Sequence, residues 1–198
     1  FVDPTPDAVD GDAPRAPRPT PSFAEVAARL AARGTRLVTP PLGVARVVGT
    51  AQLVVLAPVP LETPAATVAT AEPVRTVNDN SIVVALEVGP TRVLLLGDVE
   101  AEGEAALVAR GGGRGDIVKV AHHGSRTSST PALIAASKAR LAIVSAGAGN
   151  RSGLPNDEVI DRWTAAGVTV LRTDLDGAAT VRLWPDGAIR YVTVLSSR

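Results

Sequence analysis

The sequence predicts an α/β fold, because short apolar strands alternate with helices from about residue 81 onward. Strands that are apolar along their whole length are typical of a sheet covered on both faces. When one helix connects two strands of the same sheet, the connection is usually a right-handed crossover between parallel strands. Hydrophobic residues make up 45% of the 198 residues, which is enough for one sizeable core.

The first part of the chain predicts a linker and then scattered elements. Residues 1–21 are rich in Pro and Asp, a composition typical of a linker or loop. A helix is expected next, because Ser22 and Glu25 fit a capping box and Gly34 provides a stop. Short strands are expected at 36–39, 44–48 and 52–57, and a long loop at 58–77. We interpret 22–198 as one domain, most regular from residue 78.

The second part predicts regular alternation. A hairpin is expected first, and the helix that follows it has acidic residues in its first turn and a glycine at its end. The expected strands are 82–88, 93–96, 117–121, 141–144, 168–171, 178–183 and 189–195. The expected helices are 100–110, 131–138 and 157–166.

Two adjacent histidines, His122 and His123, are the only histidines in the chain. They follow the predicted strand at 117–121, and the predicted strand at 93–96 ends one helix earlier in Gly97-Asp98. The carboxyl ends of parallel strands meet at one edge of a sheet, so Asp98 and a histidine are expected to converge there. Asp and His are ligands for Zn or Mn, and a bridging carboxylate suits the two-metal sites that cleave phosphodiesters. Alternatively, Asp98 is only a turn residue after Gly97. The polar segment 78–81, which precedes the predicted strand at 82–88, is a third candidate cluster, and its alternative interpretation is a polar turn.

The charge is balanced overall but uneven along the chain. The net charge of zero argues against a strongly basic nucleic-acid domain. Between Arg110 and Arg151, however, seven basic residues accompany one acid, Asp116. This excess predicts either a solvated basic face or a rim that attracts a phosphate-containing substrate. Aromatic residues are only 3% of the chain, which excludes base stacking as a main binding mode, and the absence of Cys excludes disulfides and thiolate metal ligands.

Three segments, 78–84, 94–100 and 118–128, resemble the ComEC family of bacterial competence proteins, which carry DNA across the cytoplasmic membrane. The similar part of that family is its C-terminal metallo-β-lactamase-like domain. Shorter agreements follow at 145–151, 155–159 and 171–177. The resemblance covers about 78–183 well and 22–57 loosely.

The resemblance implies a metallo-β-lactamase-like αββα sandwich, of which this chain holds the C-terminal two-thirds. It implies Asp98 and His122 as metal ligands, with His123 as the alternative or as a supporting residue, and two divalent ions, Zn or Mn, in the complete domain. It also implies a nuclease that degrades the single strand of DNA that is not imported. The candidates for substrate contact are Lys119, Ser125, Arg126 and Arg151. The parent protein is expected in the bacterial cell membrane, with this domain at the outer face against other domains of the parent.

Two departures from the family pattern predict an incomplete site. The chain lacks the upstream His-x-His-x-Asp-His loop, and Leu154 stands where family members often carry His. Because the chain begins with Phe1, we interpret it as a fragment, inactive by itself and with open sheet edges. The rival hypotheses are a non-catalytic DNA-binding or structural module, and a hydrolase of the same fold acting on another phosphoester or a lactone.

Overall fold

The computed structural model describes residues 22–36, 41–58 and 78–195, which fall into two units divided between Thr39 and Pro40. In the first unit, helix α1 (Phe23–Ala31) begins with the predicted capping box. The Ser22 hydroxyl accepts the Glu25 N–H, and the Glu25 carboxylate accepts the Ser22 N–H at 2.7 Å. The predicted linker at 1–21, most of the strand at 36–39 and most of the loop at 58–77 lie outside the described residues.

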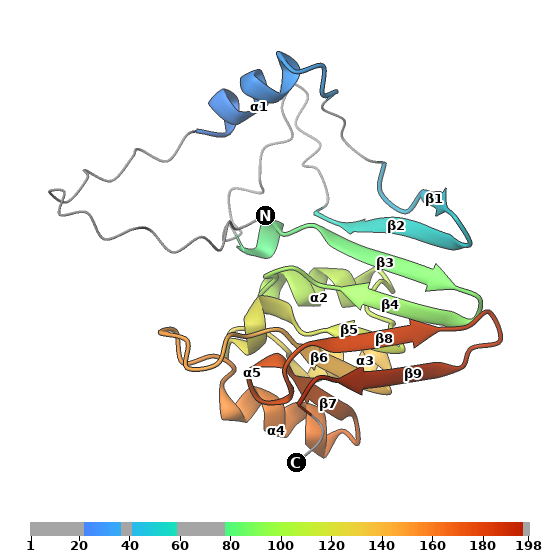
Figure 1. Cartoon of the computed structure of the whole chain (residues 1–198), viewed down its shortest axis with the longest axis vertical. Coiled ribbons are helices and arrows are strands. Elements are labelled where there is room, and N and C mark those ends of the chain that lie inside the picture. The colour runs from blue at the N-terminus through green and yellow to red at the C-terminus, as the bar shows by residue number, and fades with distance from the viewer. Residues whose placement is uncertain (1–21, 37–40, 59–77, 196–198) are drawn as a thin grey trace, which may run out of the picture. The chain divides into compact units, whose positions relative to one another are not determined.

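The second unit contains a seven-stranded mixed sheet, with its strands in chain order (Figure 1). The strands are β1 (Ala45–Val48), β2 (Ala51–Ala57), β3 (Val83–Val88), β4 (Thr91–Leu95), β5 (Ile117–Lys119), β6 (Leu141–Val144) and β7 (Thr169–Arg172). Strands β1 to β4 are antiparallel, and β4 to β7 are parallel. The carboxyl ends of β4 and β5 therefore lie at the same edge, as the sequence predicted.

Helices cover one face of this sheet. Helices α2 (Ala101–Ala109), α3 (Pro131–Ser137) and α4 (Asp157–Ala165) each connect two neighbouring parallel strands. The core between helices and sheet contains fully buried aliphatic side chains from both layers and the indole of Trp163. The helical connections between parallel strands confirm the α/β prediction.

A two-stranded hairpin, β8 (Ala179–Leu183) and β9 (Ile189–Thr193), covers part of the opposite face (Figure 1). Val181, Leu183 and Ile189 pack there against Ile117, Leu141 and Leu171 of the sheet. The layers are thus helices, mixed sheet and hairpin. The metallo-β-lactamase-like sandwich stays a prediction. No helix in the described part of the chain is long and apolar enough to cross a membrane.

Short elements differ from the sequence prediction. Strand β5 ends at Lys119, and Ala121–Gly124 forms a 3₁₀ turn, η2, instead of extending the strand to residue 121. Two further short elements, η1 (Asn78–Asn80) and α5 (Thr173–Asp176), had no helical prediction. Their few residues carry no helical periodicity, because one turn is too short to show it.

Candidate metal-binding site at the sheet edge

The Gly97-Asp98 turn follows β4 and is fixed by the segment before β3. The Asp98 N–H donates to the Ser81 hydroxyl at 3.1 Å. Gly97 has φ +60°, and a Cβ there would lie 2.9 Å from the Ser81 Cβ. Only glycine accepts both the left-handed backbone and this close approach without strain. The Asp98 carboxylate is left about half exposed, with 46% of the side chain accessible.

The two histidines occupy a strained turn directly after β5. Both have left-handed backbone conformations, with φ +46° at His122 and +52° at His123. Such conformations are uncommon for residues other than glycine and cost of order 1–3 kcal/mol each. The His122 N–H donates to the Gly97 carbonyl at 3.0 Å, which ties the histidine turn to the aspartate turn. The two strand-end loops therefore form one backbone unit.

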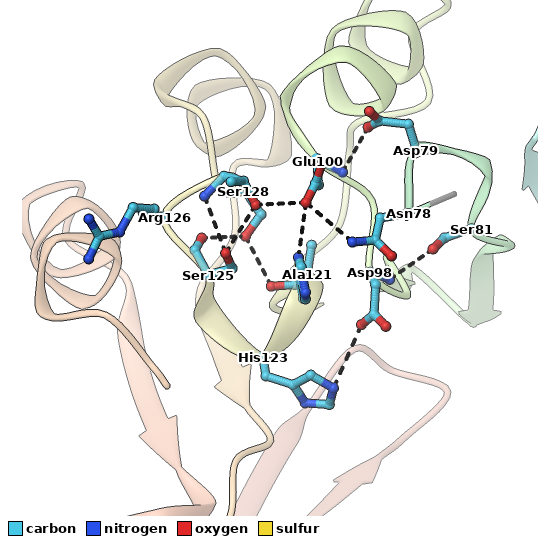
Figure 2. A network of polar contacts seen from close by, with 12 residues as sticks. Asn78, Asp79, Ser81, Asp98, Glu100, Ala121, His123, Ser125, Arg126 and Ser128 are labelled. Atoms are coloured by element: carbon cyan, nitrogen blue, oxygen red, sulfur yellow. Dashed lines mark hydrogen bonds and ion pairs between the residues drawn. The ribbon is translucent and has the colours of Figure 1, made fainter. Parts of the chain in front are cut away.

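His123 is the histidine that faces Asp98. Its Nε2 lies 3.7 Å from Asp98 Oδ1 (Figure 2). Its Nδ1 lies 2.6 Å from the Ser145 carbonyl oxygen. Because a carbonyl only accepts, Nδ1 carries the proton, and in the neutral ring Nε2 has a free lone pair. An imidazole held by a backbone carbonyl on one nitrogen is the usual arrangement of a metal-binding histidine.

His122 lies beside a different carboxylate. Its Nδ1 is 3.3 Å from Glu100 Oε1 and makes no hydrogen bond among the described residues, although the atom is buried. The same Glu100 oxygen accepts from Asn78 Nδ2 at 3.2 Å and from the Thr127 hydroxyl at 3.0 Å (Figure 2). The structure thus brings His123, and not His122, next to Asp98, while His122 joins a more enclosed polar network.

Lys119 also belongs to this edge. It lies at the end of β5, and its ammonium donates to the Val120 carbonyl at 2.8 Å. Burial lowers the pKa of Lys119, and the Coulombic attraction of the Asp98 carboxylate partly opposes this shift. The Asp98 carboxylate therefore acts electrostatically on Lys119, which is one of the candidates for substrate contact.

The other candidates for substrate contact lie further along the same loop and on the next one. The Ser125 and Thr127 hydroxyls are 3.0 Å apart. The Arg126 guanidinium is exposed and 4.0 Å from Glu158, and Arg151 is exposed in a turn. Arg114 and Arg140 both lie within 4 Å of Asp116, so part of the basic excess in this region is paired within the chain.

A buried carboxylate holds the loop that follows the histidines. Glu104 of α2 is fully buried and accepts the backbone N–H groups of Ser129 and Thr130 at 2.6 and 2.7 Å. Burial raises the pKa of Glu104, and the hydrogen bonds from Thr130 and Ser129 oppose this shift. The hydroxyl of Ser128 donates to the Ala121 carbonyl at 3.0 Å. These contacts fasten the Ser128–Thr130 part of the loop to helix α2 and to the start of η2.

Asp79 is a residue whose role the sequence analysis did not find. It is buried in η1, and its Oδ1 accepts the Glu100 N–H at 2.9 Å (Figure 2). The same oxygen accepts the Gly103 N–H, also at 2.9 Å. These donors belong to the first turn of α2, whose own N-cap side chain makes no capping bond. The polar cluster at 78–81 was the available signal, but the partners of Asp79 lie more than 20 residues away in the chain.

The donor atoms fit one side of a divalent-metal site. Asp98 and His123 present one carboxylate and one imidazole nitrogen toward the same point, a set that suits Zn or Mn. Within residues 22–36, 41–58 and 78–195, no group of three or more His, Cys, Asp or Glu is close enough to hold an ion. A metal bound by Asp98 and His123 needs further ligands, because protein sites for these ions use three or four.

Comparison with known proteins reveals relatives with names from bacterial competence. No protein-family model matches the chain. It is 36% identical over 103 residues to Competence protein ComA of Neisseria gonorrhoeae. It is 35% identical over 106 residues to ComE operon protein 3 of Bacillus subtilis and 34% over 109 residues to Recombination protein 2 of Haemophilus influenzae. These matches cover 51–55% of this chain but only 14–15% of each relative.

The chain therefore has homologues in the ComEC family over about half of its length, and the predicted resemblance is confirmed to that extent.

Proposed function

We propose that this chain forms one side of a metal-dependent phosphodiesterase site that degrades the non-imported strand of DNA during DNA uptake. The homology to competence and recombination proteins supports a role in DNA uptake. The parent protein is proposed to lie in the bacterial membrane with this domain at the outer face. The other domains of the parent are its proposed partners.

The observation that carries the proposal is the convergence of Asp98 and His123. Two groups that accept hydrogen bonds, 3.7 Å apart and half exposed, favour a cation between them. The Ser145 carbonyl fixes the ring of His123 so that Nε2 faces the carboxylate. This position, at the carboxyl ends of parallel strands, is also where open α/β sheets bind ligands.

Asp98 and His123 are the proposed ligands, and His122 is kept as the alternative. The ions would be Zn or Mn, two in the complete site, with the further ligands outside the described residues. The chemistry that such ions supply in phosphodiester cleavage is activation of water and stabilisation of the leaving oxygen. Lys119, Arg126 and Arg151 would attract the phosphates, and Ser125 would contact the substrate.

Metal binding tests the ligand assignment. Calorimetry with Mn²⁺ or Zn²⁺ on the 198-residue chain should show weak binding of at most one ion. Asp98→Ala and His123→Ala should each abolish it, whereas His122→Ala should leave it nearly intact. Tight binding of two ions would contradict the claim that the site is incomplete. Loss of binding in His122→Ala alone would assign that histidine instead.

Cleavage tests the activity. The assay uses the longer protein of which this chain is proposed to be a part, with a labelled single-stranded oligonucleotide and added Mn²⁺ or Zn²⁺. Asp98→Ala should abolish cleavage, and Asp186→Ala, in an exposed turn of the hairpin, should not change it. Cleavage that is unaffected by Asp98→Ala would contradict the assignment of Asp98 as a metal ligand in the cleavage site. Metal-independent binding without cleavage by the unaltered protein would favour the non-catalytic DNA-binding module.

A further inference from the structure

The outward face of the β8–β9 hairpin gathers two arginines and a tryptophan. Side chains alternate between the two faces of a strand, and Val181, Leu183 and Ile189 pack inward on the sheet. Arg182 and Arg190 are paired directly across the two strands, and both are exposed. They therefore share the outward face of the hairpin.

Neither arginine has a carboxylate partner among the described residues. None of the ion pairs among the described residues includes Arg182 or Arg190. Like charges directly opposite each other on an antiparallel pair are destabilising. An anion bound between the two guanidiniums would relieve this repulsion. A pair of adjacent phosphates has the matching charge and acceptor geometry.

An aromatic ring lies beside the arginines. The guanidinium of Arg190 lies 5.8 Å from the centre of the Trp184 ring, and 37% of Trp184 is exposed. This cation–π contact holds the arginine over the indole before any ligand arrives. A shallow pocket of about 290 Å³ opens here, lined by Thr180, Arg182, Trp184, Arg190, Tyr191 and Val192. Its volume is just below the ~300–1,000 Å³ range of pockets that hold small organic groups.

We propose that this face of the hairpin is a binding site for single-stranded DNA, separate from the Asp98 and His123 cluster. Arg182 and Arg190 contact the phosphates, and Trp184 stacks with a base. The inference rests on the proposed function, because it names a second contact for the same substrate. A single strand is favoured over a duplex because only unpaired bases offer their faces for stacking. With one tryptophan in the patch, stacking adds to phosphate binding and does not dominate it, in keeping with the low aromatic content.

The test is fluorescence anisotropy with a labelled oligothymidylate of about 15 nucleotides, a length near the upper end of single-strand site sizes. EDTA is present, so that neither metal nor cleavage affects the result. In Arg182→Ala/Arg190→Ala, affinity should fall about tenfold, and the slope of log K against log salt should decrease by about 1.4, or ~0.7 for each lost phosphate contact. Arg182→Lys/Arg190→Lys should keep the salt slope of the wild type, because both positive charges remain.

Tryptophan variants test the stacking. Trp184→Leu should weaken binding about tenfold, since one base–aromatic stack is worth ~1–3 kcal/mol. Trp184→Phe should recover most of the loss, because it keeps a ring. The matched control is Arg46→Ala, an exposed arginine in β1, which should change affinity by no more than about twofold. Circular dichroism and thermal midpoints check that each variant is folded.

Several outcomes overturn the inference: unchanged binding in the double alanine variant, equal losses in Trp184→Phe and Trp184→Leu, or equal affinity for duplex DNA. Binding to vesicles of anionic phospholipid, with none to the oligonucleotide, would show that the patch contacts membranes instead. Failure here is distinct from failure of the proposed function. Failure of the hairpin site appears as DNA binding in EDTA that does not depend on the two arginines. Failure of the proposed function appears as cleavage that survives Asp98→Ala.

Discussion

Replacing Asp79 by Ala removes the side chain that joins η1 to the start of α2. One carboxylate oxygen accepts two backbone N–H groups, from Glu100 and Gly103, at 2.9 Å each. The Gly103 bond is buried, and the Asp79 side chain is 2% exposed. Water therefore has little access to the donor that the substitution leaves unpaired.

The expected loss follows from three contributions that overlap. An unsatisfied buried donor costs about 1–3 kcal/mol. Loss of a helix cap costs about 0.5–2 kcal/mol, and loss of a negative charge at a helix N-terminus about 0.3–1 kcal/mol. Because the same two bonds supply all three, we expect a net loss of about 3 kcal/mol in the free energy of unfolding. Asp79→Asn keeps an acceptor oxygen but loses the charge, so it should lose only about 1 kcal/mol.

The assay is urea unfolding followed by circular dichroism at 222 nm. A loss of about 3 kcal/mol should also lower Tm by roughly 6–12 °C for a chain of this size. Asp186→Ala is the matched control, because Asp186 accepts one exposed backbone bond from Ala188, and it should cost no more than about 0.5 kcal/mol. If Asp79→Ala is no more destabilising than this control, then η1 does not cap α2 and the reasoning is refuted.

Three further predictions concern Glu104, Lys119 and Gly124. Burial raises the pKa of Glu104, so its contribution to stability is full below the pKa of the unfolded chain and is lost as pH rises through the folded-state pKa. The unfolding free energy of the wild type relative to Glu104→Gln should fall over that pH range, and a difference that rises instead would contradict the shift. Burial lowers the pKa of Lys119, and ¹³C NMR of its Cε in the metal-free protein should give a pKa below the ordinary value for lysine. Asp98→Asn should lower it further, and an increase would show that the carboxylate does not act on the amine. Gly124→Ala should lose about 2 kcal/mol or more in urea unfolding, because φ is +82° and the new Cβ would lie 2.5 Å from the Pro155 Cβ; full stability would mean that the loop moves freely.

The sequence predicted the elements whose signals are local. Ser22 and Glu25 form the expected capping box within four residues of each other. The apolar runs that end before Gly97 and before His122 form neighbouring parallel strands, as their spacing around one helix indicated. These predictions succeeded because a capping box and an apolar run are both patterns of residues that are close in the chain.

Contacts between residues that are far apart in the sequence were not predictable in the same way. A polar turn was one alternative for Asn78 to Ser81. The segment does turn, but Asp79 bonds to α2 and Ser81 to the Asp98 backbone. The 3₁₀ turn after β5 was missed because both histidines are left-handed, and residues other than glycine adopt that conformation uncommonly. Composition placed aromatic stacking outside the main binding modes, and only the hairpin register placed Trp184 beside Arg190.

By itself, the sequence determined the α/β class, the edge of the sheet at which Asp98 and the histidines meet, and the resemblance to competence proteins. Strand periodicity and motif spacing are enough for that, because parallel strands must end on the same side. The tertiary structure decided that His123 faces Asp98 while His122 faces Glu100. The two side chains are adjacent in sequence and equal in chemistry, and only the backbone angles of one turn and the Ser145 carbonyl, 22 residues away, distinguish them.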